Sequence, residues 1–106
     1  MNFRTKVKWI NPKFCIPPHR VTHPDKFIDL CKQFTISGWD TKKPTLVGYN
    51  YKGIQLISGS HRWAAASHSN IKIPVIIYPY ETIMRIWGTD EWLELLQNIP
   101  NIPYTK

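Results

Sequence analysis

The sequence predicts a small α+β domain in which helices pack on a small mixed β-sheet. Three observations predict this fold class: short apolar runs typical of strands recur along the chain, helical spacing appears between them, and a hairpin pattern lies near the middle. With 106 residues, 42% of them hydrophobic, the chain is long enough for one domain with one modest core. We expect residues 1–106 to form this domain, with a core over about 5–88, then a C-terminal helix and an extended tail over 89–106.

The N-terminal part predicts a strand, a stiff connector and a helix. Residues 7–10 alternate in character as a strand does, and residues 11–20 hold three prolines, which exclude a helix and predict an extended connector. Thr22 or His23 then caps a helix that starts at Pro24. Helical spacing predicts its buried stripe, which consists of Phe27, Ile28, Leu30, Cys31 and Phe34.

The rest of the chain alternates strands and helices. In order, it predicts a loop over 35–44, a hairpin of strands over 44–49 and 54–57, a helix over 62–69, a strand over 71–77, and helices over 81–87 and 89–96 that are split at Gly88. Pro74 favours an edge position or a strand end for the strand that contains it.

Composition excludes several classes of protein. The two cysteines, Cys15 and Cys31, are too few for a disulfide framework or a zinc site, so we expect two half-buried thiols. The chain has no run of about 18 apolar residues, so no membrane helix is predicted. The N-terminus lacks an apolar signal segment. A cytoplasmic protein is therefore expected, with no membrane partner.

Charge is unevenly distributed along the chain. Residues 1–80 contain 12 Lys and Arg against 3 Asp and Glu, whereas residues 81–106 contain 2 against 4. A basic domain favours polyanions such as nucleic acids or nucleotides, although net charge also serves solubility.

The stretch from Leu56 to Ala66 predicts an anion site. A buried strand breaks at Gly59 and turns directly into a helix, and a helix N-terminus offers free N–H groups and positive potential. Arg62 is the strongest candidate, because its guanidinium binds two phosphate oxygens at once. Ser60 either caps the helix or bonds phosphate. His61 binds phosphate when protonated, acts as a general acid or base, or packs as a neutral ring.

Other residues are weaker candidates for the same site. Arg20 and Lys26 add positive charge. Asp40 and Asp29 are the candidate carboxylates for Mg²⁺ or for activating water, with a turn residue as the alternative for Asp40. Trp39 and Trp63 flank the turn and either stack on a base or pack in the protein. No metal ligands are predicted, because His19 and His23 precede the helix and so do not share a helical face.

These residues resemble the ParB/sulfiredoxin superfamily. The stretch Leu-Ile-Ser-Gly-Ser-His-Arg-Trp-Ala-Ala-Ala and the later Ile-Lys-Ile-Pro-Val-Ile-Ile are similar to the family's Gly-x-x-Arg turn and the strand that follows it. The Pro18-His19-Arg20 segment before the helix is similar to the first conserved box of ParB-like domains, so the resemblance covers about residues 5–88.

The resemblance implies one nucleotide site that serves several activities. Family members bind and hydrolyse CTP, use ATP to repair sulfinic acid, phosphorylate free serine from ADP, or act as nucleases. Lys26 aligns with a helix lysine that contacts nucleotide in sulfiredoxin, and Asp29 and Gln33 fall on the corresponding face. Ser60 replaces the sulfiredoxin cysteine, so we expect no sulfiredoxin activity. The partition proteins carry further DNA-binding and dimerisation domains after this one, so centromere clamping is not expected either.

Two functional hypotheses follow. In the first, the chain is an enzyme that binds ATP or CTP with Mg²⁺ and hydrolyses it, transfers its phosphate, or cleaves DNA. The phosphates would lie on residues 59–62 with help from Arg20 and Lys26, and Asp40 and His61 would be catalytic. In the second, the chain is a non-catalytic basic module, phage- or plasmid-borne, that binds DNA or a host protein.

Overall fold

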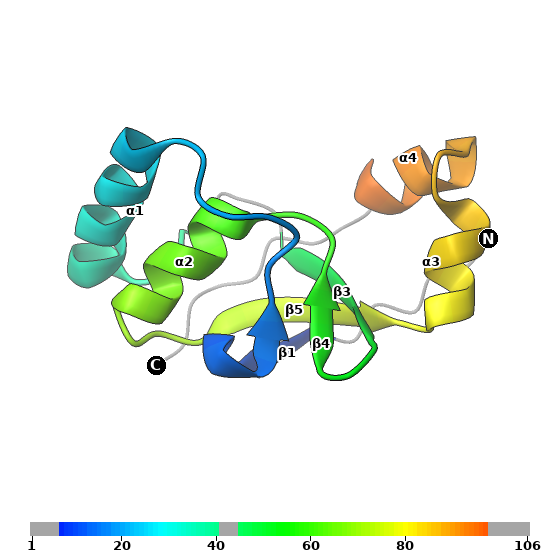
Figure 1. Cartoon of the computed structure of the whole chain (residues 1–106), viewed down its shortest axis with the longest axis horizontal. Helices are drawn as coiled ribbons and strands as arrows, with labels where there is room; N and C mark the ends of the chain where they lie inside the picture. Colours follow the sequence, from blue (N-terminus) through cyan, green and yellow to red (C-terminus); the bar gives the residue numbers. More distant parts are fainter. Residues whose placement is uncertain (1–6, 41–44, 98–106) are drawn as a thin grey trace.

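The computed structural model describes residues 7–40 and 45–97, which form an α+β fold as predicted. The elements in order are β1 (Val7–Ile10), a 3₁₀ turn (Pro12–Phe14), β2 (Cys15–Ile16), α1 (Pro24–Ser37), β3 (Leu46–Asn50), β4 (Ile54–Leu56), α2 (Ser60–His68), β5 (Ile73–Tyr78), α3 (Tyr80–Ile86) and α4 (Asp90–Gln97). Figure 1 shows α1 and α2 together at one end of the molecule and α3 and α4 at the other.

The sheet is mixed and has the strand order β1-β5-β3-β4-β2. β3 and β4 form the predicted hairpin, with Gly48 opposite Leu56, and β3 pairs with β5 in parallel. β2 runs parallel to β4, and β1 closes the other edge antiparallel to β5. The order brings the end of β4, three residues before Gly59, beside the connector that contains β2.

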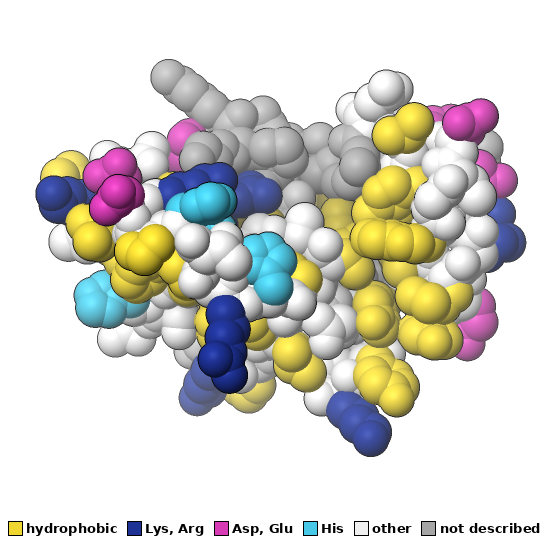
Figure 2. All heavy atoms as spheres, turned by 45° about the horizontal axis from the view of Figure 1, so that its top comes forward, with side chains coloured by type: hydrophobic (Ala, Val, Ile, Leu, Met, Phe, Trp, Pro, Cys, Tyr) yellow, Lys and Arg dark blue, Asp and Glu magenta, His cyan; other side chains and the backbone are white. Residues whose placement is uncertain are grey.

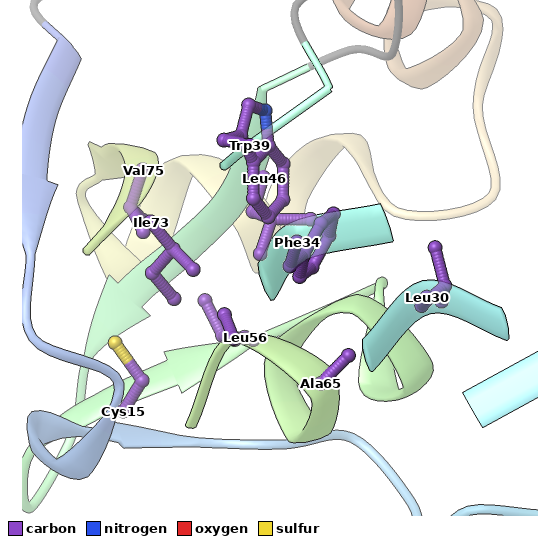
Figure 3. Close-up of a cluster of buried hydrophobic side chains, with 10 residues drawn as sticks. Cys15, Leu30, Phe34, Trp39, Leu46, Leu56, Ala65, Ile73 and Val75 are labelled. Carbon is purple, nitrogen blue, oxygen red and sulfur yellow. The ribbon is translucent and has the colours of Figure 1, made fainter. Parts of the chain in front are cut away.

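Side-chain alternation along the strands produces two cores. Leu46, Leu56 and Val75 lie in one cluster with Leu30 and Phe34 of α1 and Ala65 of α2 (Figure 3). The neighbouring residues Val47 and Ile76 lie in a second cluster with α3 and α4. Because successive strand residues point to opposite faces, α1 and α2 cover one face of the sheet and α3 and α4 the other.

Several details differ from the sequence prediction. The connector is not extended throughout, because Pro12 supplies the first residue of a 3₁₀ turn that Asn11 caps through its side chain. α1 continues to Ser37, where Gly38 ends it at a φ of 72°, so the predicted loop starts later. Ile28 was expected in the buried stripe but is 47% exposed, because α1 packs on α2 through Leu30 and Phe34.

Two more features differ from the sequence prediction. α2 starts at Ser60, two residues earlier than expected. β5 is an interior strand rather than an edge, so the edge alternative for Pro74 is wrong. The strand-end alternative holds, because Pro74 is the second residue of β5 and precedes Val75, the first residue that pairs with β3.

The remaining expectations can be compared directly. Cys15 is buried and Cys31 is half-buried, and both are free thiols. The predicted hairpin residue Pro44 and the extended tail after 97 lie outside the described residues. Within the described part of the chain, no helix is long and apolar enough to cross a membrane.

Candidate anion-binding site

The turn at residues 59–62, called here the Gly59 turn, is fixed by a steric constraint. Gly59 precedes α2 in the left-handed conformation, with φ 84° and ψ 32°. A Cβ atom at this position would lie 2.4 Å from Cδ2 of the buried Leu46. The position therefore requires glycine both for its backbone angles and for the space beneath it.

Ser60 and His61 attach this turn to the connector and to the start of α1. The Ser60 Oγ accepts a hydrogen bond from the His19 N–H at 3.1 Å, and the hydroxyl is buried. The His61 Nε2 accepts the N–H groups of Thr22 at 3.2 Å and His23 at 3.0 Å. Segments about 40 residues apart in sequence are thereby held together.

His61 is suited to remain neutral. An Nε2 that accepts N–H groups carries no proton. Burial lowers the pKa of His61, and the positive charge of Lys26 and the rings of His23 and His19 lower it further. The ring stacks on His23 with centroids 5.5 Å apart and meets His19 edge-on at 6.0 Å. This geometry accounts for His61 as a neutral packed ring, while its phosphate-binding and acid–base roles stay predictions.

The Gly59 turn opens on a cleft of about 530 Å³, called here the α1–α2 cleft. Its lining comes from the connector and from the first turns of two helices: His19, Thr22, His23, Lys26 and residues 59–62. The starts of α1 and α2 thus meet at one hollow, and helix starts carry positive potential and N–H groups without intrahelical partners. Figure 2 shows histidine side chains beside Lys and Arg side chains on the face near α1.

Arg62 extends from the first turn of α2 into this cleft. Its guanidinium carbon lies 5.5 Å from the centroid of the Trp39 ring. Burial lowers the pKa of Arg62, whereas the negative charge of Asp40 acts in the opposite direction. A guanidinium stays protonated despite such a shift, so the cleft holds a half-buried permanent cation.

Comparison with solved structures reveals the same architecture. A C-terminally truncated chromosome-partitioning protein ParB from Caulobacter crescentus, complexed with CTP-gamma-S, superposes with a TM-score of 0.59 at 14% identity, over 88% of this chain and 54% of that one. Sulfiredoxin from Arabidopsis thaliana gives 0.57 at 16% identity, over 89% and 99%. The chain has a ParB/sulfiredoxin-like fold.

The remaining comparisons limit the conclusion from this likeness to the fold. A conserved hypothetical protein from Pyrococcus furiosus superposes with a TM-score of 0.57 at 18% identity, over 74% of this chain and 34% of that one. No family model and no curated protein matches the sequence. This chain spans about half the length of the ParB structure. At such identities the comparisons establish the ParB/sulfiredoxin-like fold alone.

In this ParB/sulfiredoxin-like fold, the structure brings some predicted site residues together and separates others. Lys26 lines the α1–α2 cleft with residues 59–62, as expected. Arg20 is exposed and lines a neighbouring apolar hollow with Val21 and Trp63 instead. Asp40 does not line the cleft, and its Oδ2 accepts a hydrogen bond from the Gln33 Nε2 at 3.3 Å.

The two flanking tryptophans both have packing roles. Trp39 is 3% exposed and packs on Phe34 with ring centroids 5.5 Å apart. The Trp63 Nε1–H donates to the Pro12 carbonyl at 2.8 Å. Packing is therefore the alternative that holds for the buried Trp39, and the half-buried Trp63 packs partly against the same core.

Thr22, His19 and His23 line the cleft although sequence reasoning did not assign them to it. The one feature of the sequence that could have indicated their place in the cleft is their position between the prolines of the connector and the start of a helix. Their proximity to His61 depends on a tertiary contact that spacing does not reveal.

The lining does not fit a protein-held Mg²⁺. Mg²⁺ requires oxygen ligands, above all carboxylates. The part of the cleft lining that the structure describes is basic and neutral, without Asp or Glu. Over residues 7–40 and 45–97, no group of three His, Cys, Asp or Glu is arranged to hold a metal ion.

Proposed function

We propose that the chain binds the phosphates of a nucleoside triphosphate, ATP or CTP, in the α1–α2 cleft. The observation that carries the proposal is the placement of Arg62 and Lys26 in a hollow that, among the described residues, is lined by no acidic side chain. A cation at a helix start opposes the helix dipole. The negative charge of Asp40 already acts on Arg62, and a phosphate in the cleft would add to this compensation and extend it to Lys26.

The backbone supports the same anion. The first N–H groups of α2 have no carbonyl acceptor within the helix, since the Trp63 N–H is the first that bonds back, to the Gly59 carbonyl at 2.8 Å. A phosphate at this turn would accept those N–H groups and the guanidinium together. The solved ParB structure of this fold holds CTP-gamma-S, which supports a nucleotide as the ligand class.

Titration calorimetry with tripolyphosphate, ATP and CTP, each with and without MgCl₂, tests this proposal. Arg62→Ala should weaken binding roughly 10- to 100-fold, because a hydrogen bond to a charged group contributes about 1.5–3 kcal/mol. Arg85→Ala is the matched control, since Arg85 lies on α3 and pairs with Glu91 at 2.6 Å. The proposal fails if no anion binds the wild type, or if Arg62→Ala binds as tightly as Arg85→Ala.

Catalysis is a separate step of the proposal. Hydrolysis, phosphate transfer or DNA cleavage should appear as phosphate release, a phosphorylated acceptor or plasmid nicking in the presence of MgCl₂, and should disappear in Arg62→Ala. Asp40→Asn tests the proposed catalytic carboxylate, and unchanged turnover in that variant removes Asp40 from the mechanism. Tight nucleotide binding without any product would leave a binding module.

A second candidate is a non-catalytic DNA-binding module. The observation that favours it is the number of exposed cations in the described structure, namely Lys8, Lys13, Arg20, Lys26, Lys32, Lys52, Lys72 and Arg85, of which Arg85 pairs with Glu91. Binding through these side chains would release counterions from DNA, so affinity for duplex DNA should fall steeply as salt rises. A DNA affinity that is independent of salt would exclude this candidate.

A further inference from the structure

Trp39 belongs to the core cluster, and its ring lies beside Arg62, which lines the α1–α2 cleft. Its indole is 3% exposed and packs on Phe34 of α1. Figure 3 shows it above Leu46, whose side chain also sets the space beneath Gly59. The ring therefore has a fixed position relative to the Gly59 turn.

The Arg62 side chain lies close to both the Trp39 ring and Gly59. Its guanidinium carbon is 5.5 Å from the Trp39 centroid, within the range of a cation–π contact. Its Nη2 lies 3.5 Å from the point where a Cβ on Gly59 would stand. The guanidinium is thus close to the Trp39 ring and to the bare backbone of the turn that lines the cleft.

We infer that Trp39 is a positioning residue, which holds the Arg62 guanidinium in the orientation that binds phosphate. This inference rests on the proposed nucleotide function. An arginine side chain has many rotamers, and fixing them before the anion arrives reduces the entropy lost on binding. The face of an indole attracts a guanidinium through its quadrupole, and this contact does not itself use the N–H groups at the guanidinium edge.

A double-mutant cycle measures this coupling. Trp39→Leu should weaken tripolyphosphate binding on the order of 5-fold, as expected for loss of a partly desolvated cation–π contact. In an Arg62→Ala background the same substitution should have no further effect. Trp39→Phe keeps an aromatic face and should recover most of the affinity.

The control separates positioning from packing. Phe34→Leu loosens the same core but keeps the Trp39 ring, so it should lower the unfolding midpoint while leaving tripolyphosphate affinity within 2-fold. If Phe34→Leu weakens binding as much as Trp39→Leu, the role of Trp39 is packing alone and the inference is overturned. Equal effects of Trp39→Leu with and without Arg62 also overturn it.

The outcomes distinguish this inference from the function on which it rests. If wild-type protein binds neither tripolyphosphate nor a nucleotide, the proposed function fails. If wild type binds and Trp39→Leu binds equally well, only the positioning role fails. Should Trp39→Leu not fold, Trp39→Phe taken through the same cycle decides the question, with an expected loss of about 2-fold that vanishes in Arg62→Ala.

Discussion

Gly59 shows how one residue determines the site. Gly59→Ala should lower the free energy of unfolding by about 2–4 kcal/mol, because a positive φ and a Cβ overlap with Leu46 both oppose it. Gly88→Ala is the matched control, since Gly88 has a φ of 78° but nothing within 4 Å of the added Cβ. It should cost only about 1 kcal/mol. Urea denaturation measures both, and equal losses would contradict the steric argument.

His61 makes stability depend on pH. The native state disfavours its protonated form, so the unfolded state binds more protons, and stability rises with pH. The contribution of neutral His61 is present above the ordinary pKa of 6.5 and is lost as pH falls below that value. The free energy of unfolding should therefore fall from pH 7.5 to pH 5.5.

His61→Gln should reduce this pH slope, since glutamine accepts hydrogen bonds without titrating. His68→Gln is the control, because His68 is exposed and lies edge-on to Phe27 at 6.1 Å, away from the turn. Urea titrations at the two pH values measure the difference. Identical slopes for wild type and His61→Gln would show that His61 is not the titrating group.

At the scale of elements, the site depends on how the connector is held against α2. Trp63 of α2 donates its indole N–H to the Pro12 carbonyl. Trp63→Phe should cost about 1–2 kcal/mol, because the carbonyl loses its partner. Trp92→Phe, in the second core, controls for the loss of indole volume. Chemical denaturation of the two variants tests this, and equal costs would argue against a role for the hydrogen bond.

At the scale of the molecule, the two ends differ in chemistry. The α1–α2 end carries the basic cleft, whereas exposed apolar side chains gather near α3 and α4 (Figure 2), including Met84, Trp87 and Leu93. Cys15 lies in the core shared by β2, α1 and α2, and burial raises its pKa to about 11. Chemical labelling of its thiol therefore measures how often the core beneath the α1–α2 cleft opens to solvent.

Thiol labelling at pH 8 should modify the half-buried Cys31 before Cys15. In Cys31→Ser protein, labelling of Cys15 should need urea, and tripolyphosphate should slow it by stabilising the native state. Rapid labelling of Cys15 without denaturant would contradict the buried position.

The sequence by itself determined the fold class and most elements. Hydrophobic period, proline and glycine positions are local signals, so the hairpin, α1, the Gly59 turn and the split at Gly88 were predicted near their observed places. The family resemblance likewise placed Lys26 with residues 59–62. The α1 end at Ser37 and the 3₁₀ turn were missed, since local propensity is weak at element ends.

Only the tertiary structure decided which side chains meet at the cleft. His61 accepts N–H groups from residues 38 and 39 positions away, and Arg62 lies over a tryptophan from a different segment. The tertiary structure also places Arg20 beside a neighbouring hollow instead of the cleft, and it places β5 in the interior of the sheet. These outcomes depend on strand order and helix packing, which are long-range contacts that no local pattern encodes.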